Sequence, residues 1–530
     1  MRRGRQRTSL VWRMGLAGRS ILCRLGVVLG RVAWVAPTLW TRRRFLRAGA
    51  IGVLGGLSLA YVAEALGVSF AQRKPLAYPI PGAVDPDPRL SFRSRPDLTV
   101  HPVAVLTAAE GVGEGHVFLT PGVDGGHSDG PLIIDDRGDP VWIHPITTGA
   151  ATNFRVQQYS DRPVLTWWEG DYVQIWGQGE CVIVDAAYSE IARIQAANGH
   201  RYDLHAFHIT PQDTALVTVY APVPNATTSR GQPVVEGIIQ EIDIATGRLV
   251  WDWHSYGAVE LSESYFPVPT DATQPYDYFH VNSIDITPDG HLLISARHTW
   301  TVYKIDRMSG KILWRLGGRR SDFAIASDAS FSWQHDARSY PDGTVTLFDD
   351  EAPPTPSRGL RVQVDEVAKT VSLVRAYAHP GVLSSSTRGN VQALPNGNVF
   401  VGWGAASFAS EFGPAGDLRF DLGLWPGLVS YRAFRCPWQG QPTDRPAVAV
   451  ERSASGGTVV YASWNGATEV ARWQIMAGAT DSDLHSVASV PRSGFETSVE
   501  LSSAWPLVAA QALDASGAVL GTSPTHRVAV

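Results

Sequence analysis

The sequence predicts an all-β protein, a six-bladed β-propeller followed by a β-sandwich of the immunoglobulin or fibronectin type. Its 530 residues include 51 Gly and 35 Pro, a composition that suits many turns between short strands. A strand-rich unit of about 50 residues recurs through the middle of the chain. After Pro446 this unit gives way to five short apolar runs separated by glycine-containing turns, as in a small sandwich domain.

One half of the recurring unit is a tight turn followed by a β-rich run. The turns lie at 288–290, 341–343 and 395–397, and their prolines are 53 and 54 residues apart. A weaker copy begins at Pro211. Pro-Asp-Gly and Pro-Asn-Gly form tight turns, so we expect a strand on each side of every copy.

The other half of the unit is a hairpin that ends in tryptophan, at Trp142, Trp251 and Trp314. Together the halves give four short antiparallel strands, which is the pattern of a propeller blade. A β-sandwich or a solenoid stays an alternative, although four strands per unit favour the propeller. The six expected units lie near residues 115–150, 153–200, 203–254, 280–315, 335–378 and 388–422.

The N-terminal residues have the pattern of an export signal. Arg42, Arg43 and Arg44 precede an uncharged Gly/Ala/Leu-rich run at 48–63, as in twin-arginine (Tat) signals, and cleavage is expected after Ala71. Residues 48–68 are also just long enough to span a bilayer as an uncleaved anchor, so both outcomes stay open. We expect a protein of the cell envelope or a secreted one, with membrane contact only through an uncleaved leader.

The expected organisation therefore has five parts, whose order follows from the leader, the repeats and the change after Pro446. They are a leader at 1–72, an N-terminal extension with a short β-segment at 73–112, the β-propeller at 113–436, a linker at 437–446 and the β-sandwich at 447–530.

Composition and missing motifs exclude several function classes. From Arg73 onward the chain has 33 basic and 49 acidic residues, so it lacks the basic face that a nucleic acid requires. It has no phosphate-binding loop, dinucleotide fingerprint or nucleophile elbow, so no cofactor is predicted. Beyond the leader only Cys181 and Cys436 remain, which leaves a disulfide open and cannot form a zinc site alone. The oligomeric state is left open.

Three predicted blades begin with a histidine shortly before the turn. His205, His280 and His335 lie 6, 8 and 6 residues before the proline of that turn. The first strand of each blade lines the central channel, so equivalent positions converge there. Arg297 and Arg388 are expected to join the histidines and to form an anion site. An imidazole is also a competent nucleophile or general acid/base near neutral pH.

Two other interpretations of the histidines stay open. Each could be a polar plug that ties neighbouring blades by hydrogen bonds. Together they could also bind zinc or copper, with Asp203 and Asp336 as partners of the ligating rings, although the arginines favour an anion. The acidic run 349–351 lacks the spacing of a calcium loop and is expected to form a solvated turn.

Aromatic residues accompany the channel positions and are candidates for binding a flat aromatic ligand. Ordinary packing between strands is the alternative for each of them. The candidates are Trp168, Tyr220, Phe279 and Trp333.

The combined motifs resemble the arylsulfotransferase (ASST) family, and most closely its actinobacterial and fungal-type branch. The resemblance runs from about Asp85 to the C-terminus and includes Phe279-His280-Val281-Asn282-Ser283 and Gln334-His335-Asp336-Ala337. The remaining motifs lie at residues 128–133, 154–156, 165–170, 295–298, 314–318 and 464–468.

The resemblance implies an enzyme that moves a sulfuryl group from a phenolic sulfate ester to a phenol without adenosine phosphosulfate. It implies that His335 is the nucleophile and becomes a sulfohistidine. His280 and Arg297 would hold the sulfate oxygens, and His205 would act as an acid/base or a further oxygen ligand. Ala206 departs from the branch, whose members tend to have glutamate there as a partner for the preceding histidine.

Two other functions stay open at this point. A non-catalytic extracytoplasmic propeller would bind a small anionic or aryl ligand and release it unchanged. A metal- or quinone-dependent oxidoreductase would carry a metal or a chromophore.

Overall fold

The computed structural model describes residues 89–528 except for 174–175, 352–354 and 382–383. The described residues contain β-strands and short 3-10 turns but no α-helix, which confirms the all-β prediction. The predicted leader lies outside the described residues. Across the described part of the chain, no helix is long and apolar enough to cross a membrane. The 3-10 turns are η1 (Leu261–Glu263), η2 (Ser327–Ala329), η3 (Gly404–Ala406) and η4 (Asp481–Asp483).

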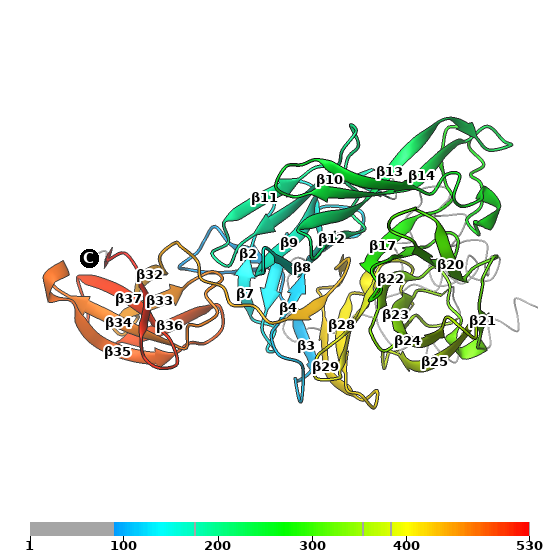
Figure 1. Ribbon diagram of the computed structural model, residues 1–530. Helices are drawn as coiled ribbons and strands as arrows, with labels where there is room; N and C mark the ends of the chain where they lie inside the picture. The colour runs from blue at the N-terminus through cyan, green and yellow to red at the C-terminus, as the bar shows by residue number, and fades with distance from the viewer. Residues whose placement is uncertain (1–88, 174–175, 352–354, 382–383, 529–530) are drawn as a thin grey trace, which may run out of the picture. The chain divides into compact units, whose positions relative to one another are not determined.

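Six sheets form most of the described chain, and in each of them four antiparallel strands make up the main part (Figure 1). The first sheet contains β31 (Phe434–Cys436), β4 (His116–Leu119), β6 (Leu132–Ile134) and β7 (Pro140–Ile143). The second contains β8 (Ala150–Tyr159), β9 (Arg162–Val173), β10 (Trp176–Val184) and β11 (Glu190–Ile194). The third contains β12 (Phe207–Ile209), β13 (Thr214–Thr227), β14 (Pro233–Asp243) and β15 (Leu249–His254), with β16 (Tyr276–Asp277) on β14.

The remaining three sheets follow the same order. The fourth contains β17 (Val281–Ile286), β18 (Leu292–Ala296), β19 (Thr301–Ile305) and β20 (Ile312–Gly317). The fifth contains β22 (His335–Ser339), β23 (Thr344–Asp349), β24 (Arg358–Asp365) and β25 (Thr370–Tyr377), with β21 (Ala324–Ile325) beyond β25. The sixth contains β26 (Asn390–Ala393), β27 (Val399–Gly402), β28 (Phe408–Phe412) and β29 (Leu418–Gly423), with β3 (Ala104–Thr107) beyond β29.

The recurring Pro-Asp/Asn-Gly turns join the first two strands of the last three of these sheets. Gly290, Gly343 and Gly397 have φ angles of 84°, 76° and 86°, which a residue with a side chain adopts only under strain. The strand expected after each turn is present as β18, β23 and β27. The sequence motif therefore fixes where the first hairpin of each unit turns.

Two strand pairs connect the sixth sheet and the segment after it to the N-terminal side of the six-sheet region. β31, which follows the sixth sheet in sequence, pairs with β4 of the first sheet, and β3 from the N-terminal side pairs with β29 of the sixth. Two short pairs accompany them, β1 (Leu90–Ser91) with β2 (Thr99–Val100) and β5 (Gly122–Val123) with β30 (Leu428–Val429).

The hydrophobic core consists of separate clusters, each shared by two successive sheets. One cluster joins the first and second sheets, and four more join each sheet to the next up to the sixth. A further cluster joins the sixth sheet to the first, with Phe420 and Leu422 packed among Val117 and Leu132. The packing order of the six sheets therefore closes on itself.

Asparagine side chains also connect successive sheets near the start of their first strands. The Nδ2 atoms of Asn153, Asn282 and Asn390 donate to the carbonyl oxygens of Leu204, Gln334 and Ala433, at 2.6, 2.7 and 2.8 Å. These asparagines therefore form the hydrogen bonds between neighbouring sheets that one interpretation of the sequence assigned to the histidines.

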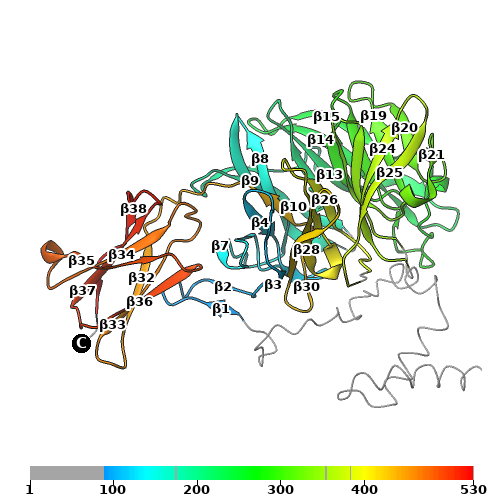
Figure 2. The same ribbon diagram turned by 90° about the horizontal axis from the view of Figure 1, so that it is seen from below.

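The strands after residue 446 form two further sheets that share one apolar core around Trp473 and Val460 (Figure 2). One sheet contains β32 (Ala447–Arg452), β33 (Thr458–Ser463) and β36 (Glu496–Leu501). The other contains β35 (His485–Pro491), β34 (Arg472–Gly478), β37 (Leu507–Leu513) and β38 (Val519–Thr522), with β39 (His526–Arg527) on β37.

The loop after β33 bonds to the edge of β7 in the first sheet. The Asn465 side chain accepts from the backbone N–H of Ile143 and donates to its carbonyl, both at 2.9 Å. The backbone N–H of Gly466 donates to the carbonyl of Val141 at 2.8 Å. These bonds satisfy backbone groups that an exposed edge strand would leave open.

Candidate functional site

The three predicted histidines lie where the first strands of the third, fourth and fifth sheets begin. His205 lies shortly before β12, His280 directly precedes β17 and His335 opens β22, and all three are buried. The rings of His205 and His280 lie edge to face with their centroids 4.8 Å apart. His335 lies close enough to both to interact with them electrostatically, although burial and then Arg297 are the larger causes of its lowered pKa. The structure thus brings together three side chains that are 130 positions apart at most in the sequence.

Each of these histidines bonds through Nδ1 to its own aspartate. The Nδ1 atoms of His205, His280 and His335 lie 2.5, 2.6 and 2.5 Å from carboxylate oxygens. The respective partners are Asp203, Asp277 and Asp350. Because a carboxylate accepts, each Nδ1 carries the proton and each Nε2 keeps its lone pair. Each ring is therefore held by an aspartate through Nδ1, with its Nε2 on the side away from that aspartate.

The partner of His335 shows that the prediction for residues 349–351 was wrong, and Asp336 does not have the role that one alternative gave it. The run 349–351 was expected to form a solvated turn, but Asp349 and Asp350 are buried because β23 carries them inward beside β22. Asp336, considered as a partner of a ligating ring, instead forms ion pairs with Arg338 and Arg432, the latter at 3.2 Å. His205 has Asp203 as its partner, so the alanine that follows it does not leave its ring unsupported.

Burial keeps the imidazoles of His280 and His335 neutral. It is the largest cause of the lowered pKa of His280 and of His335, and the positive charge of Arg297 lowers both further. Burial also raises the pKa of Asp277, which is opposed by the nearby His298. A neutral imidazole whose Nε2 lone pair is free can act as a nucleophile or a base near pH 7.

Arg297 connects the fourth sheet to the segment before the sixth. Its Nη2 donates to the carbonyl of Ser386 at 3.0 Å, and its guanidinium lies over the ring of Trp333 with 4.9 Å to the centroid. Two residues beyond Ser386, the backbone N–H of Arg388 donates to Nε2 of His335 at 3.3 Å. Arg297, Arg388 and His335 therefore belong to one connected set of contacts.

The predicted aromatic residues separate into two groups. Tyr220 lies beside the histidines, with ring centroids 5.5 Å from His205 and 5.6 Å from His280, and Trp333 lies under Arg297. Trp168 and Phe279 are more deeply buried, at 1% and 0% exposed, than Tyr220 and Trp333, which share the cluster of Phe279 but remain 9% and 7% exposed. The Trp168 ring fills the space above three glycines of β9 and β10, where any added Cβ would collide with it.

An aromatic stack continues from Trp333 through residues that the sequence did not assign to substrate binding. Trp300 lies edge to face with Trp333 at 5.2 Å and stacks on Tyr265 at 3.7 Å. Both tryptophans have positive φ angles, 52° for Trp300 and 57° for Trp333, which is unusual for bulky residues and is concentrated at functional sites. The signal in the sequence was only a tryptophan three residues after Arg297.

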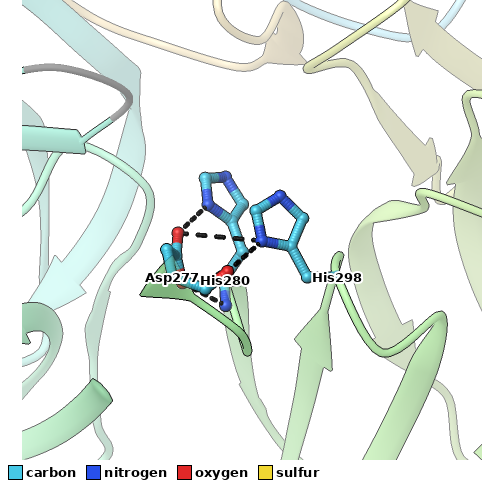
Figure 3. A group of neighbouring side chains, drawn as sticks. All are labelled: Asp277, His280 and His298. Carbon is cyan, nitrogen blue, oxygen red and sulfur yellow. Dashed lines mark hydrogen bonds and ion pairs between the residues drawn. The ribbon is translucent and has the colours of Figure 1, made fainter. Parts of the chain in front are cut away.

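Among the described residues, Asp277, His280 and His298 form a group whose possible metal-ligating atoms lie within 4.8 Å of one another (Figure 3). Their hydrogen bonds do not suit a cation. His298 uses Nδ1 to donate to the carbonyl of Asp277 at 2.6 Å, and its Nε2 lies 3.2 Å from Nη1 of Arg297. Since both nitrogens are engaged and a guanidinium is adjacent, this group orients His280 rather than binding a metal.

Comparison with protein families gives one match. Residues 155–423, just over half of the chain, match the model of the family described as "Arylsulfotransferase (ASST)". The matched span contains the three histidines, their aspartates and Arg297. No curated protein matches the chain.

Comparison with solved structures gives only distant similarities. A streptogramin B lyase is 10% identical with a TM-score of 0.33, over 68% of this chain and 94% of that one. The virginiamycin B lyase of Staphylococcus aureus is 12% identical with a TM-score of 0.30, over 61% and 88%. A protein from Lactobacillus plantarum is 12% identical with a TM-score of 0.33, over 74% and 100%. TM-scores this low do not support any assignment of function to this chain.

Proposed function

The chain belongs to the arylsulfotransferase family, and from this premise we propose that it moves a sulfuryl group from a phenolic sulfate ester to a phenol through a sulfohistidine. Membership in the family supports an arylsulfotransferase-type enzyme that acts on small aryl molecules. The finer proposal is that the donor is the sulfate ester itself, without adenosine phosphosulfate, and that His335 carries the group in transit.

The observation that carries the proposal is the environment of His335. Its Nδ1–H is held by buried Asp350 at 2.5 Å, its ring is kept neutral by burial, and Arg297 lies nearby. A nitrogen nucleophile needs a lone pair, a fixed orientation and a nearby charge for the group that it attacks. At His335 all three come together. Its Nε2 accepts only a long bond of 3.3 Å from Arg388, which an incoming sulfur atom would replace.

In the first step Nε2 of His335 attacks the sulfur of the donor. The bond between sulfur and the aryl oxygen breaks, and that oxygen leaves as a phenolate with the electron pair. The N-sulfonated ring becomes cationic, and Asp350 stabilises it through Nδ1–H. Donors with acidic phenols would react fastest because their phenolates need little protonation.

In the second step the hydroxyl oxygen of the acceptor phenol attacks the same sulfur. The bond between sulfur and Nε2 breaks, its electron pair returns to the ring, and the acceptor proton passes to Nε2 of His205. The two steps share one site and give ping-pong kinetics. Charge on the three sulfuryl oxygens is stabilised by the guanidinium of Arg297.

The aromatic residues beside the site support aryl substrates. The ring of Tyr220 lies next to His205 and His280, and the ring of Trp333 lies under Arg297. Trp300 extends this aromatic surface from Trp333. Flat aromatic ligands gain from offset stacking or edge contacts with such rings. We propose that the aryl groups of the donor and the acceptor bind against these rings.

The arrangement of sheets supports a finer description of the fold. We propose that the six sheets are the blades of a β-propeller, because their clusters and strand pairs return from the sixth to the first. The two sheets after residue 446 would form a β-sandwich. The proposed divisions are those expected from the sequence, with the propeller at 113–436 and the sandwich at 447–530.

We propose further that the protein is exported by the twin-arginine route, on the basis of Arg42, Arg43 and Arg44 and the apolar run after them. Fusing residues 1–72 to a reporter that is active only after Tat export tests this. Export of the fusion supports the proposal, and loss of export is expected when two of the three arginines become lysines. A fusion that stays inside the cell overturns it.

The central test uses purified protein with p-nitrophenyl sulfate and phenol. We expect release of nitrophenol that depends on phenol, formation of phenyl sulfate, and loss of both in His335→Asn. Quenching with the donor alone should leave one sulfuryl group on the peptide that contains His335, detected by mass spectrometry under alkaline conditions. His254→Asn, at a half-exposed histidine on β15, is the matched control and should retain full activity.

The same experiment separates the alternative of a binding protein. A wild-type protein that is stabilised by the sulfate ester, transfers nothing across a panel of donors and returns the ester unchanged would overturn the enzymatic proposal.

A further inference from the structure

Three buried polar atoms without a hydrogen-bond partner in the described part of the chain converge on one small pocket. They are Oγ1 of Thr120, Nη1 of Arg388 and Oη of Tyr431, whose residues are 3%, 8% and 4% exposed. All three side chains line the same pocket, which lies between the first, second and sixth sheets. Buried polar atoms are nearly always bonded, so such a set marks the position of an occupant.

The chemistry of the three atoms defines that occupant. A guanidinium can only donate, and the two hydroxyls are free to donate as well. The pocket has room for about one water-sized group. Tyr172, which also lines the pocket, shares a hydrogen bond with Arg388. The pocket still suits a single oxygen atom that accepts hydrogen bonds, because an apolar group would leave Oγ1 of Thr120, Nη1 of Arg388 and Oη of Tyr431 without a partner.

Charge restricts the occupant further. Nη2 of Arg388 forms an ion pair with Asp124 at 2.5 Å, so the guanidinium is already neutralised. A carboxylate entering the pocket would lie near Asp124 and would be repelled by it. An uncharged oxygen, such as that of a hydroxyl or a ketone, avoids this repulsion and still uses the three donors.

The same residues reach the proposed reaction centre. The backbone N–H of Arg388 donates to His335, and Arg388 adopts a strained φ of 75° that serves both contacts. The ring of Tyr431 lies 5.7 Å from that of His205. A structural water could occupy the pocket without any contact between its lining residues and the reaction centre. A substituent of a bound aryl substrate requires that the pocket lie beside that centre.

We propose that this pocket binds an uncharged oxygen substituent of the aryl substrate, so that the enzyme selects phenols that carry a second hydroxyl or carbonyl group. The inference rests on the proposed function, because it names the class of substrate for that site. It assigns Thr120, Arg388 and Tyr431 as specificity-determining residues.

The test measures binding rather than turnover. Isothermal titration of the full chain with phenol, 4-hydroxyacetophenone and 4-hydroxybenzoate compares no second oxygen, an uncharged one and a charged one. We expect 4-hydroxyacetophenone to bind about five- to tenfold more tightly than phenol, as one added buried hydrogen bond implies, and more tightly than 4-hydroxybenzoate. Tyr431→Phe and Thr120→Val should each reduce this preference to about twofold or less.

Matched controls and outcomes keep the inference separate from the proposed reaction. Tyr461→Phe, on β33 of the C-terminal sheets, removes a hydroxyl elsewhere and should retain the preference. Equal binding of phenol and 4-hydroxyacetophenone, or a preference that Tyr431→Phe leaves intact, means that the pocket holds water and overturns the inference. Tightest binding of 4-hydroxybenzoate overturns the choice of an uncharged group. Selective binding without sulfuryl transfer overturns only the reaction.

Discussion

His335 differs from the other two central histidines in the source of its aspartate. Asp203 and Asp277 precede His205 and His280 by two and three residues, so each pair forms within one local segment. Asp350 lies fifteen residues after His335 and directly follows β23, which pairs with β22. A partner supplied by the neighbouring strand is fixed by the sheet, which suits the ring that must be held most firmly.

Asp350→Asn should lower kcat by about 100-fold or more while changing the KM for the donor little. An amide in place of the carboxylate can no longer stabilise the cationic sulfonated ring, and it permits the other imidazole tautomer. Steady-state kinetics with p-nitrophenyl sulfate measure the effect, and Asp350→Glu should recover part of kcat.

Asp365→Asn, at the exposed end of β24 before the turn to β25, is the matched control for that substitution. If Asp350→Asn lowers the melting temperature but leaves kcat unchanged, Asp350 is structural and does not position His335.

The pH profile tests the neutrality of His335. Burial, followed by the charge of Arg297, holds its pKa well below the usual value. Since the neutral ring is the nucleophile, kcat/KM should stay level as the pH falls through about 6.5 and decline only below that. Arg297→Met removes a positive charge, so the pKa of His335 rises and the acid limb moves to higher pH. An acid limb near 6.5 in the wild type, or one that Arg297→Met leaves in place, contradicts this account.

At the level of strands, the sequence motifs predicted turns well and side-chain partners poorly. The Pro-Asp-Gly turns and the strands beside them follow from local chemistry, and they lie where expected. Asp350 could not be assigned, because its approach to His335 depends on the pairing of β22 with β23. Trp168 and Phe279 were chosen for their proximity in sequence to site motifs, whereas strand alternation and nearby glycines place them in the core.

Arg432 illustrates a contact that depends on several strands at once. Its guanidinium donates to the Asn153 side chain at 2.5 Å and to the carbonyl of Asn282 at 2.7 Å, and it pairs with Asp336. These partners belong to the second, fourth and fifth sheets, while Arg432 lies two residues before β31 of the first. One side chain thus connects four sheets.

Arg432→Met should lower the free energy of unfolding by about 3 kcal/mol, because it leaves Asp336 with one fewer cation and leaves two buried acceptors unpaired. Thermal and denaturant unfolding measure the loss. Arg419→Met breaks an exposed ion pair with Asp417 and should cost about 1 kcal/mol or less. Equal effects of the two substitutions would show that the central contacts of Arg432 contribute no more than a surface pair.

Across the whole chain, what the sequence could predict was the repetition, because each unit repeats the same local signals. The contacts between the first and the sixth sheet could not be predicted, since they join segments without a shared motif. Arg435 is an example: it is buried on β31, and its Nε lies 2.6 Å from Glu411 and its Nη1 2.7 Å from Asp136. The pocket of Thr120, Arg388 and Tyr431 depends on the same return of the chain.

Truncation from the C-terminus separates the role of this return from that of the last two sheets. Removing residues 447–530 keeps β31, so the six sheets should still unfold cooperatively, as measured by circular dichroism. The loss of the bonds from Asn465 and Gly466 exposes the edge of β7, so this protein should also aggregate more than the full chain in size-exclusion chromatography. Removing residues 434–530 also deletes β31 and Arg435, which leaves Glu411 buried without its cation, and no cooperative unfolding should remain. If the shorter chain unfolds as cooperatively as the longer one, the strand pair between β31 and β4 does not hold the ring of sheets together.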